Sequence, residues 1–160
     1  MKQTPIELAW QAGMVDGEGC LTIARQLRPG RPSPAFRVSV TVTNTDFGLL
    51  RPFKAAWGGS IYDRPDGRKE KDWASSGTWH CPDWQLKPFL EAMLPFLRGK
   101  QKQARLLLDF IAHKKSFKRY KGSTEGEARG GSAPLGLKEI AYRERVWNAV
   151  RLLNSKGRFS

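Results

Sequence analysis

The sequence predicts an α+β fold with the element order αββαββα and an additional helix at the C-terminus. Three observations lead to this fold class. A strong helix start opens the chain, two pairs of short strands follow with a helical segment between them, and helical periodicity dominates the remainder. A length of 160 residues fits one compact domain.

The first helix is predicted from its N-terminal residues. Thr4 can cap the helix, Pro5 suits the first helical position, and Glu7 completes a capping box. The glycines that follow Asp16 are expected to end it. One face carries small residues at helical spacing: Ala9, Ala12, Gly13 and Asp16. Most other positions are apolar, so this is either a core helix beneath a sheet or one of a close-packed pair across a two-fold axis.

The strands are predicted from alternation of apolar and polar residues. The clearest is Phe36–Thr43, which has one apolar face and one polar face without acidic residues. It pairs with a strand over about Cys20–Arg28, across a turn rich in Pro and Gly. A helix over about Phe47–Trp57 separates this hairpin from a second one. That hairpin comprises Ser60–Arg64 and about Trp73–Cys81, where Trp73 and Trp79 share a face of unknown direction.

The rest of the chain is predicted to be mainly helical, over about 83–97, 100–114 and 137–154. Residues 122–136 are rich in Gly, Ser and Pro, which is typical of a flexible connection. We therefore expect a core of residues 1–121, a connection of residues 122–136, and a C-terminal helical extension of the same domain over residues 137–160.

Charge and composition restrict the functional classes. Lys and Arg number 28 against 15 acidic residues, a formal charge of +13. Such an excess suits a polyanionic partner, although a generic basic surface would also produce it. The two cysteines and two histidines have no zinc-ligand spacing, which excludes a zinc finger and disfavours a His-based nuclease. Without a signal pattern or a bilayer-length apolar run, we expect an intracellular protein without a membrane partner, in an organelle or a microbial cytoplasm.

The segment Gln11–Gly19 ends the first predicted helix with two acids, Asp16 and Glu18, on either side of one glycine. Carboxylates are poorly placed at a helix C-terminus, where the helix dipole favours cations. A divalent metal facing DNA phosphates would stabilise them, because hard cations take oxygen ligands. Turn capping or ion pairs with nearby Lys and Arg would also explain both acids.

This segment resembles the LAGLIDADG motif of homing endonucleases, and the αββαββα order matches that family. Val42–Asn44 is similar to the family's polar active-site position at a strand end. Pro95–Ala104 is similar to the segment that carries its active-site lysine. The resemblance covers about residues 5–115. The single motif is most similar to the homodimeric, intron-encoded branch of the family.

The resemblance implies a site-specific double-strand DNA endonuclease of intron homing. It would hydrolyse phosphodiester bonds at a long, roughly palindromic target as a homodimer, with Mg²⁺, or Mn²⁺ in its place. Glu18 and the carbonyl of Gly17 would bind the metal, Asn44 would position water, and Lys100 would stabilise phosphate charge. The small-residue face of the first helix, Ala9, Ala12, Gly13 and Asp16, would form the dimer interface.

The resemblance also implies a curved sheet that lies in the DNA major groove. A two-stranded ribbon fits this groove, where Arg can recognise guanine and Gln adenine. The residues expected to contact DNA are Thr22, Ala24, Gln26, Arg28, Arg37, Ser39, Thr41, Tyr62 and Arg64. An ordinary solvated strand face is the alternative for each. The basic residues around 113–121 would contact phosphates.

Three departures from the family pattern leave a binding-only protein as the alternative. Glu18 stands where many relatives have Asp, Asn44 where a subgroup has Gln, and Gly48 near the place of a further basic residue. Such a protein would be an intron RNA-splicing maturase with intron RNA as its partner, a degenerate nuclease, or a DNA-binding regulator. Retention of Glu18 and Lys100 favours cleavage, since a regulator would be expected to have lost the motif acids.

Overall fold

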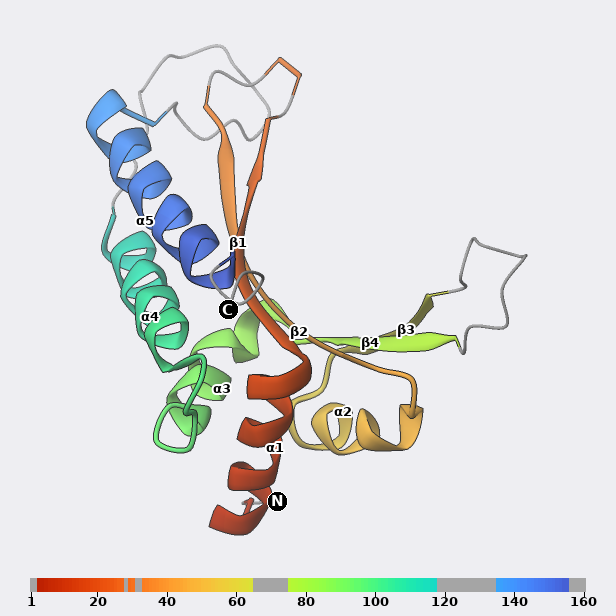
Figure 1. Ribbon diagram of the computed structural model, residues 1–160. Coiled ribbons are helices and arrows are strands. Elements are labelled where there is room, and N and C mark those ends of the chain that lie inside the picture. Colours follow the sequence, from red (N-terminus) through yellow and green to blue (C-terminus); the bar gives the residue numbers. More distant parts are fainter. Residues whose placement is uncertain (1–2, 28, 31–32, 65–74, 118–134, 156–160) are drawn as a thin grey trace.

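The computed structural model describes residues 3–27, 29–30, 33–64, 75–117 and 135–155 (Figure 1). It confirms the α+β fold class and the order αββαββα followed by a C-terminal helix. The elements are α1 (Pro5–Glu18), β1 (Gly19–Gln26), β2 (Ala35–Asn44), the 3₁₀ turn η1 (Phe47–Leu49), α2 (Arg51–Trp57), β3 (Ser60–Arg64), β4 (Ser76–His80), the 3₁₀ turn η2 (Asp83–Gln85), α3 (Leu86–Met93), α4 (Gln101–Ser116) and α5 (Leu137–Ser155). None of the helices in these ranges is long and apolar enough to span a membrane.

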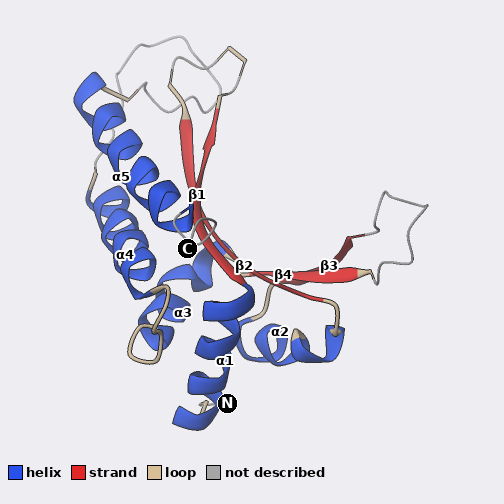
Figure 2. Ribbon diagram, in the orientation of Figure 1, coloured by secondary structure: helices blue, strands red, loops and turns tan. Residues whose placement is uncertain are grey.

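The four strands form one antiparallel sheet in the order β1-β2-β4-β3. The sheet bends where the two hairpins meet, and the helices lie on its convex side (Figure 2). Alternation along the strands explains this layering, because Leu21 and Ile23 of β1 and every second residue of β2 from Phe36 to Val42 are buried beneath the helices. The residues between them face the concave side, which no labelled helix covers (Figure 1).

The N-terminus of α1 has the predicted capping box. Thr4 Oγ1 accepts the N–H of Glu7 at 3.3 Å, and the Glu7 carboxylate accepts the N–H of Thr4 at 2.7 Å. The C-terminus differs from the prediction, since Gly17 stays helical and the helix continues to Glu18. Gly19 ends it by turning directly into β1. A Cβ at Gly19 would lie 2.5 Å from the Val15 carbonyl oxygen, so this close approach requires glycine.

Prolines explain why two predicted helices are each split. Asp46 caps a 3₁₀ turn by accepting the N–H of Gly48 at 2.7 Å, and α2 then restarts with Pro52 in its first turn. An uninterrupted helix would have placed the Pro52 ring against the carbonyl of Gly48. Likewise, η2 precedes α3, whose first turn holds Pro88, where the missing N–H has no intrahelical partner to lose.

Trp79 on β4 faces the helices and is fully buried. Its indole N–H donates to the Gly58 carbonyl at 2.8 Å, and its ring packs against Phe53 and Phe89 with centroid distances of 5.1 and 5.4 Å. The sequence did not show which way Trp79 faces, and the structure places it in the core. Trp73 lies outside the described residues.

The C-terminal helix α5 packs against β1 and α4. Arg25 on β1 pairs with Glu144 at 3.0 Å, and the Asn154 side chain donates to the Leu21 carbonyl at 2.9 Å. At the other end of α5, the buried Glu139 accepts hydrogen bonds from Arg143 and from His113 of α4. The predicted connection of residues 122–136 lies, apart from its last two residues, outside the described part of the chain, and the domain division stays a prediction.

The Glu139 cluster predicts acid-sensitive stability. Burial raises the pKa of the Glu139 carboxyl, but the hydrogen bonds and charges of His113 and Arg143 outweigh burial and hold the pKa below its ordinary value. The carboxylate therefore stabilises the fold above its unfolded-state pKa, and this contribution is lost as the pH falls through the lowered pKa. We expect Glu139→Gln to lower the free energy of unfolding at pH 7 by about 3 kcal/mol, since it leaves Arg143 without its charged partner.

Urea unfolding at pH 7 and at pH 3 tests this expectation. The difference between Glu139→Gln and the wild type should shrink at pH 3, because the contribution of the carboxylate is lost as the pH falls through its lowered pKa. Glu144→Gln is the control, because it removes a half-exposed ion pair and should have a much smaller effect at pH 7. An equal loss at both pH values would contradict a role for the Glu139 charge.

Candidate active site

Glu18, the last residue of α1, presents an exposed carboxylate at the junction of the helix with the sheet. No described residue donates a hydrogen bond to it. Gly17 is exposed as well, and a Cβ built there would meet nothing within 4 Å, so the space beside the helix end is open. A carboxylate and a free peptide carbonyl are the oxygen donors that Mg²⁺ prefers. These two residues therefore fit the predicted metal ligands in donor chemistry.

Metal ligation by one chain alone would be incomplete. Within the described residues, no group of three or more His, Cys, Asp or Glu side chains is placed to hold a metal ion. Mg²⁺ commonly keeps several water molecules and takes only one or two protein carboxylates beside phosphate oxygens. The arrangement at Glu18 suits such an ion better than it suits a fully protein-enclosed metal.

Lys100 lies directly before α4, and its side chain reaches the C-terminal end of α1. Its ammonium donates to the backbone carbonyls of Val15, at 3.0 Å, and Asp16. These carbonyls end a helix and carry its negative dipole, so a cation is favoured here. Burial lowers the pKa of Lys100, and the neighbouring carboxylates, including Glu18, oppose this only in part. The structure thus brings Lys100 and Glu18 to the same helix end.

Asp16 lies near the end of α1, and its side chain binds within its own chain. Its carboxylate accepts the backbone N–H of Arg98 at 2.6 Å and that of Lys100 at 2.8 Å. It therefore holds the segment before α4, and with it Lys100, against α1 within the same chain. These contacts engage its carboxylate within its own chain, and its place in a dimer interface stays a prediction.

Asn44 is the last residue of β2. It lies two residues beyond Val42, which pairs with Gly19 at the start of β1, and it pairs with Gly77 of β4. Its side-chain oxygen accepts the N–H of Asp46 at 2.8 Å, which forms a local turn before η1. Asn44 thus ends its strand, but its side-chain oxygen is engaged by the backbone of Asp46, and its role in positioning water stays a prediction.

The concave face of the sheet carries most of the residues predicted to contact DNA. Those placed on it are Thr22, Ala24, Gln26, Arg37, Ser39, Thr41 and Tyr62. Arg28 lies outside the described residues, and Arg64 ends β3 with a side chain that is likewise not described. Sequence reasoning missed Thr78 and His80, which the register places opposite Tyr62 and Ser60. Thr78 bonds to Thr43 at 2.9 Å, and His80 lies edge-on to Tyr62. Their alternation with the buried Trp79 was the available signal.

The small-residue face of α1 is only partly exposed. Ala9 and Gly13 are exposed, but Ala12 is fully buried in the core of its own chain. Ala12 therefore has no surface to offer a partner, which corrects its assignment to the dimer interface. The exposed stripe is instead formed by Ile6, Ala9, Trp10, Gly13 and Gly17.

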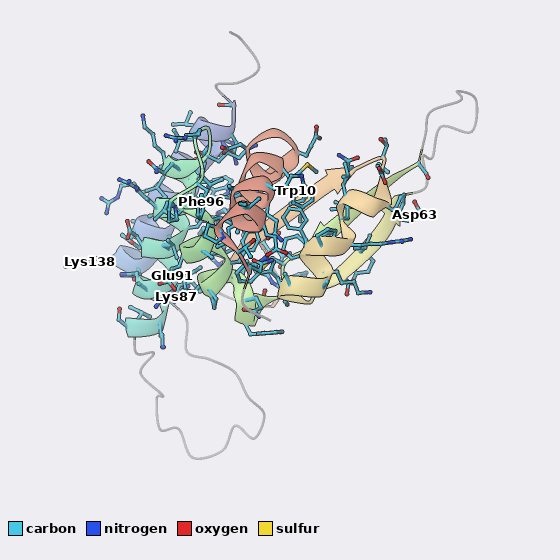
Figure 3. All side chains as sticks on the ribbon, turned by 90° about the horizontal axis from the view of Figure 1, so that it is seen from below. Trp10, Asp63, Lys87, Glu91, Phe96 and Lys138 are labelled. Carbon is cyan, nitrogen blue, oxygen red and sulfur yellow. The ribbon has the colours of Figure 1, made fainter. Side chains whose placement is uncertain are left out.

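An apolar groove of about 630 Å³ lies beside this stripe, between α1 and α2. Trp10 lines it from α1 (Figure 3), and Pro52 and Ala55 line it from α2. Trp10 is 40% exposed and Ile6 is 81% exposed, which is unusual for apolar side chains of this size. The exposed part of α1 thus combines large apolar side chains with glycines.

Comparison with known proteins identifies relatives with this architecture. No family model matches the chain. DNA endonuclease I-CvuI from Chlorella vulgaris is 34% identical over 110 residues, which is 66% of this chain and 64% of that protein, slightly under two thirds of its length. The crystal structure of I-CvuI with its target, in the presence of Ca, superimposes with a TM-score of 0.67 and 25% identity, covering 92% of this chain and 82% of that one.

A more distant structure supports the fold alone. The LAGLIDADG homing endonuclease I-LtrWI bound to target DNA superimposes with a TM-score of 0.62 at 14% identity, covering 92% of this chain and 45% of that one. The relationship to I-CvuI extends to the sequence. The chain belongs to the LAGLIDADG homing endonuclease family.

Proposed function

We propose that this protein is a site-specific, divalent-metal-dependent DNA endonuclease that acts as a homodimer. The observation that carries the proposal is the exposed Glu18 carboxylate, to which no described residue donates a hydrogen bond, at the same end of α1 as the Lys100 ammonium. The fold holds both residues in place. Gly19 caps α1 directly after Glu18, and the Asp16 carboxylate accepts the backbone N–H of Lys100. The relative I-CvuI is a DNA endonuclease that has been crystallised with DNA.

In this proposal each residue at the site has one task. Glu18 and the carbonyl of Gly17 hold Mg²⁺, or Mn²⁺ in its place, which when bound lowers the pKa of water and neutralises phosphate charge. Lys100, already restrained by two carbonyls, places a positive charge where phosphate charge increases. Asn44 orients water through its side-chain NH₂ group, because its side-chain oxygen accepts the N–H of Asp46.

The homodimer follows from what one chain lacks. The described residues of one chain offer a single such carboxylate, whereas cutting both DNA strands needs the site twice. A homodimer with two-fold symmetry provides two sites, although each chain carries only one motif. The stripe with Trp10, Gly13 and Gly17 supplies both apolar area and room for close approach of a second α1. Two Glu18 residues would then meet near the axis, and the target would be long and roughly palindromic.

DNA would lie against the concave face of the sheet. The strand residues placed there are small, polar or basic, and the chain carries a net charge of +13. A two-stranded antiparallel ribbon fits the major groove of B-DNA, where each base pair presents a distinct set of donors and acceptors. The absence of acids among the described strand residues on this face removes repulsion from phosphates.

The charge predicts a steep dependence of DNA binding on salt. Each phosphate neutralised contributes a slope of about −0.9 to log K against log salt, so binding through 6–10 phosphates should weaken roughly 10³-fold or more between 50 and 200 mM salt. Fluorescence anisotropy with a labelled duplex measures this directly. A nearly flat dependence would contradict nucleic-acid binding through the basic surface.

A binding-only protein is the second candidate. It is favoured by the occupied side-chain oxygen of Asn44 and by Gly48 at the place of a further basic residue. Incubating a randomised duplex library with the protein and Mg²⁺ separates the candidates. Reproducible cuts at one near-symmetric sequence support the endonuclease. Enrichment by binding without cutting, with Mn²⁺ as well, would favour the regulator or maturase, and intron RNA would then be the next ligand to test.

A further inference from the structure

One acidic side chain lies beside the otherwise acid-free strands of the concave face. Asp83 belongs to η2, which follows β4, and it pairs with Arg37 of β2. Arg37 Nε donates to Asp83 Oδ1 at 3.4 Å, and Nη2 donates to Oδ2 at 2.9 Å. This two-point contact uses one side of the guanidinium. The edge formed by Nη1 and the second N–H of Nη2 stays free.

The ion pair borders a hollow on the concave face of the sheet. The hollow has a volume of about 380 Å³, and Arg37 and Asp83 line it together with Ala24, Gln26 and Ser39. Ala24 pairs with Arg37 across β1 and β2, so a small side chain lies beside the arginine. The surroundings therefore leave the guanidinium room to meet a ligand that enters against the sheet.

Stabilisation of the fold is a weak explanation for this ion pair. The side chains of Arg37 and Asp83 are 66% and 61% exposed, and exposed ion pairs contribute little to folding. On a surface that binds a polyanion, an added carboxylate also repels the ligand. Its effect on the arginine is more specific, because a free Arg side chain samples many rotamers and the carboxylate restricts it to few.

We propose that Asp83 is a positioning residue that orients Arg37 to read a guanine in the major groove. The free guanidinium edge donates two N–H groups to O6 and N7 of guanine, the pairing that distinguishes this base from the other three. The Asp83 carboxylate repels a phosphate from the same place and thereby favours a base edge over the DNA backbone. The inference rests on the proposed DNA-binding function and adds a residue outside the strands to the specificity surface.

Selection from a randomised duplex library by binding tests the proposal. The wild type should enrich a target with guanine at one position in each half-site. Arg37→Ala should lose that preference by about 5- to 140-fold, the range for a bidentate arginine–guanine pair. Asp83→Ala should lose most of it while binding unselected DNA as well as the wild type or better. Arg37→Lys should keep overall affinity with a weaker guanine preference, because the lysine ammonium can still donate to guanine but lacks the planar fork that Asp83 orients.

Asp63→Ala is the matched control. Asp63 is an exposed acid of β3 that makes no hydrogen bond or ion pair with a described residue, and its removal changes the net charge by the same amount. It should leave the guanine position unchanged, and the melting temperatures of both Asp variants should equal that of the wild type.

The outcomes separate this inference from the proposed function. If the wild type enriches no sequence, specific DNA binding fails and the inference fails with it. If the wild type enriches a target that Asp83→Ala selects equally well, only the inference is overturned. A stronger guanine preference in Asp83→Ala would also overturn it, since the carboxylate would then be withholding Arg37 from the DNA.

Discussion

Glu18→Gln is expected to abolish DNA cleavage while leaving DNA binding intact. The substitution keeps the size of the side chain and replaces a charged oxygen ligand by a neutral amide. Loss of residues that merely support metal ligands already costs about 10- to 100-fold, so loss of the ligand itself should lower the cleavage rate by roughly 100-fold or more. Single-turnover cleavage of the target selected from the library, with Mg²⁺ in excess, measures the effect.

Two variants control this experiment. Glu18→Asp keeps the ligand type and shortens the side chain by one methylene, so it should retain far more activity than Glu18→Gln. Glu91→Gln removes one acid from α3, where Glu91 pairs with the exposed Lys87, and should cleave like the wild type. DNA binding by Glu18→Gln should stay within a few-fold of the wild type. Cleavage by Glu18→Gln at nearly the wild-type rate would remove Glu18 from the proposed mechanism.

Local patterns were sufficient to predict most of the fold. The capping box at Thr4 and the alternation along β2 are local signals, and both elements formed where they were expected. The errors arose at the ends of elements, where the backbone geometry decides. The helix α1 continues through Gly17 because the close packing of Gly19 on Val15, rather than the first glycine, sets its end. Pro52 is visible in the sequence, but α2 has no side-chain cap that would have marked its first residue.

The residues of the proposed site could be named from the sequence, but their arrangement in space could be predicted only in part. Glu18 and Lys100 are far apart in the sequence, and only the family resemblance linked them before the structure placed both at one helix end. Helical spacing identified small residues on α1, but spacing alone does not tell which side of the stripe faces the sheet. Ala12 consequently proved to be buried. The partners of Asp16 are backbone N–H groups, which residue types do not reveal.

Gly13→Leu is expected to convert the protein to a monomer while making the monomer more stable. Gly13 is exposed in the middle of α1, and a Cβ at this position meets nothing within 4 Å in its own chain. Replacing a helical glycine by leucine should therefore stabilise the isolated chain, by about 0.5–1 kcal/mol. Across a two-fold axis the same side chain would separate the two helices, and overpacking costs about 1–3 kcal/mol for each substitution.

A dimer contains the substitution twice, so association should weaken by roughly 2–6 kcal/mol. This raises the dissociation constant about 30-fold or more. Sedimentation velocity over a concentration series measures this change, and cleavage of both strands should fall with it. Ala112→Leu, at an exposed position of α4, is the control and should alter neither property. The two effects of Gly13→Leu have opposite signs, so misfolding cannot imitate them: a misfolded variant would lose stability together with the dimer. A Gly13→Leu protein that dimerises as tightly as the wild type would exclude this face of α1 as the interface.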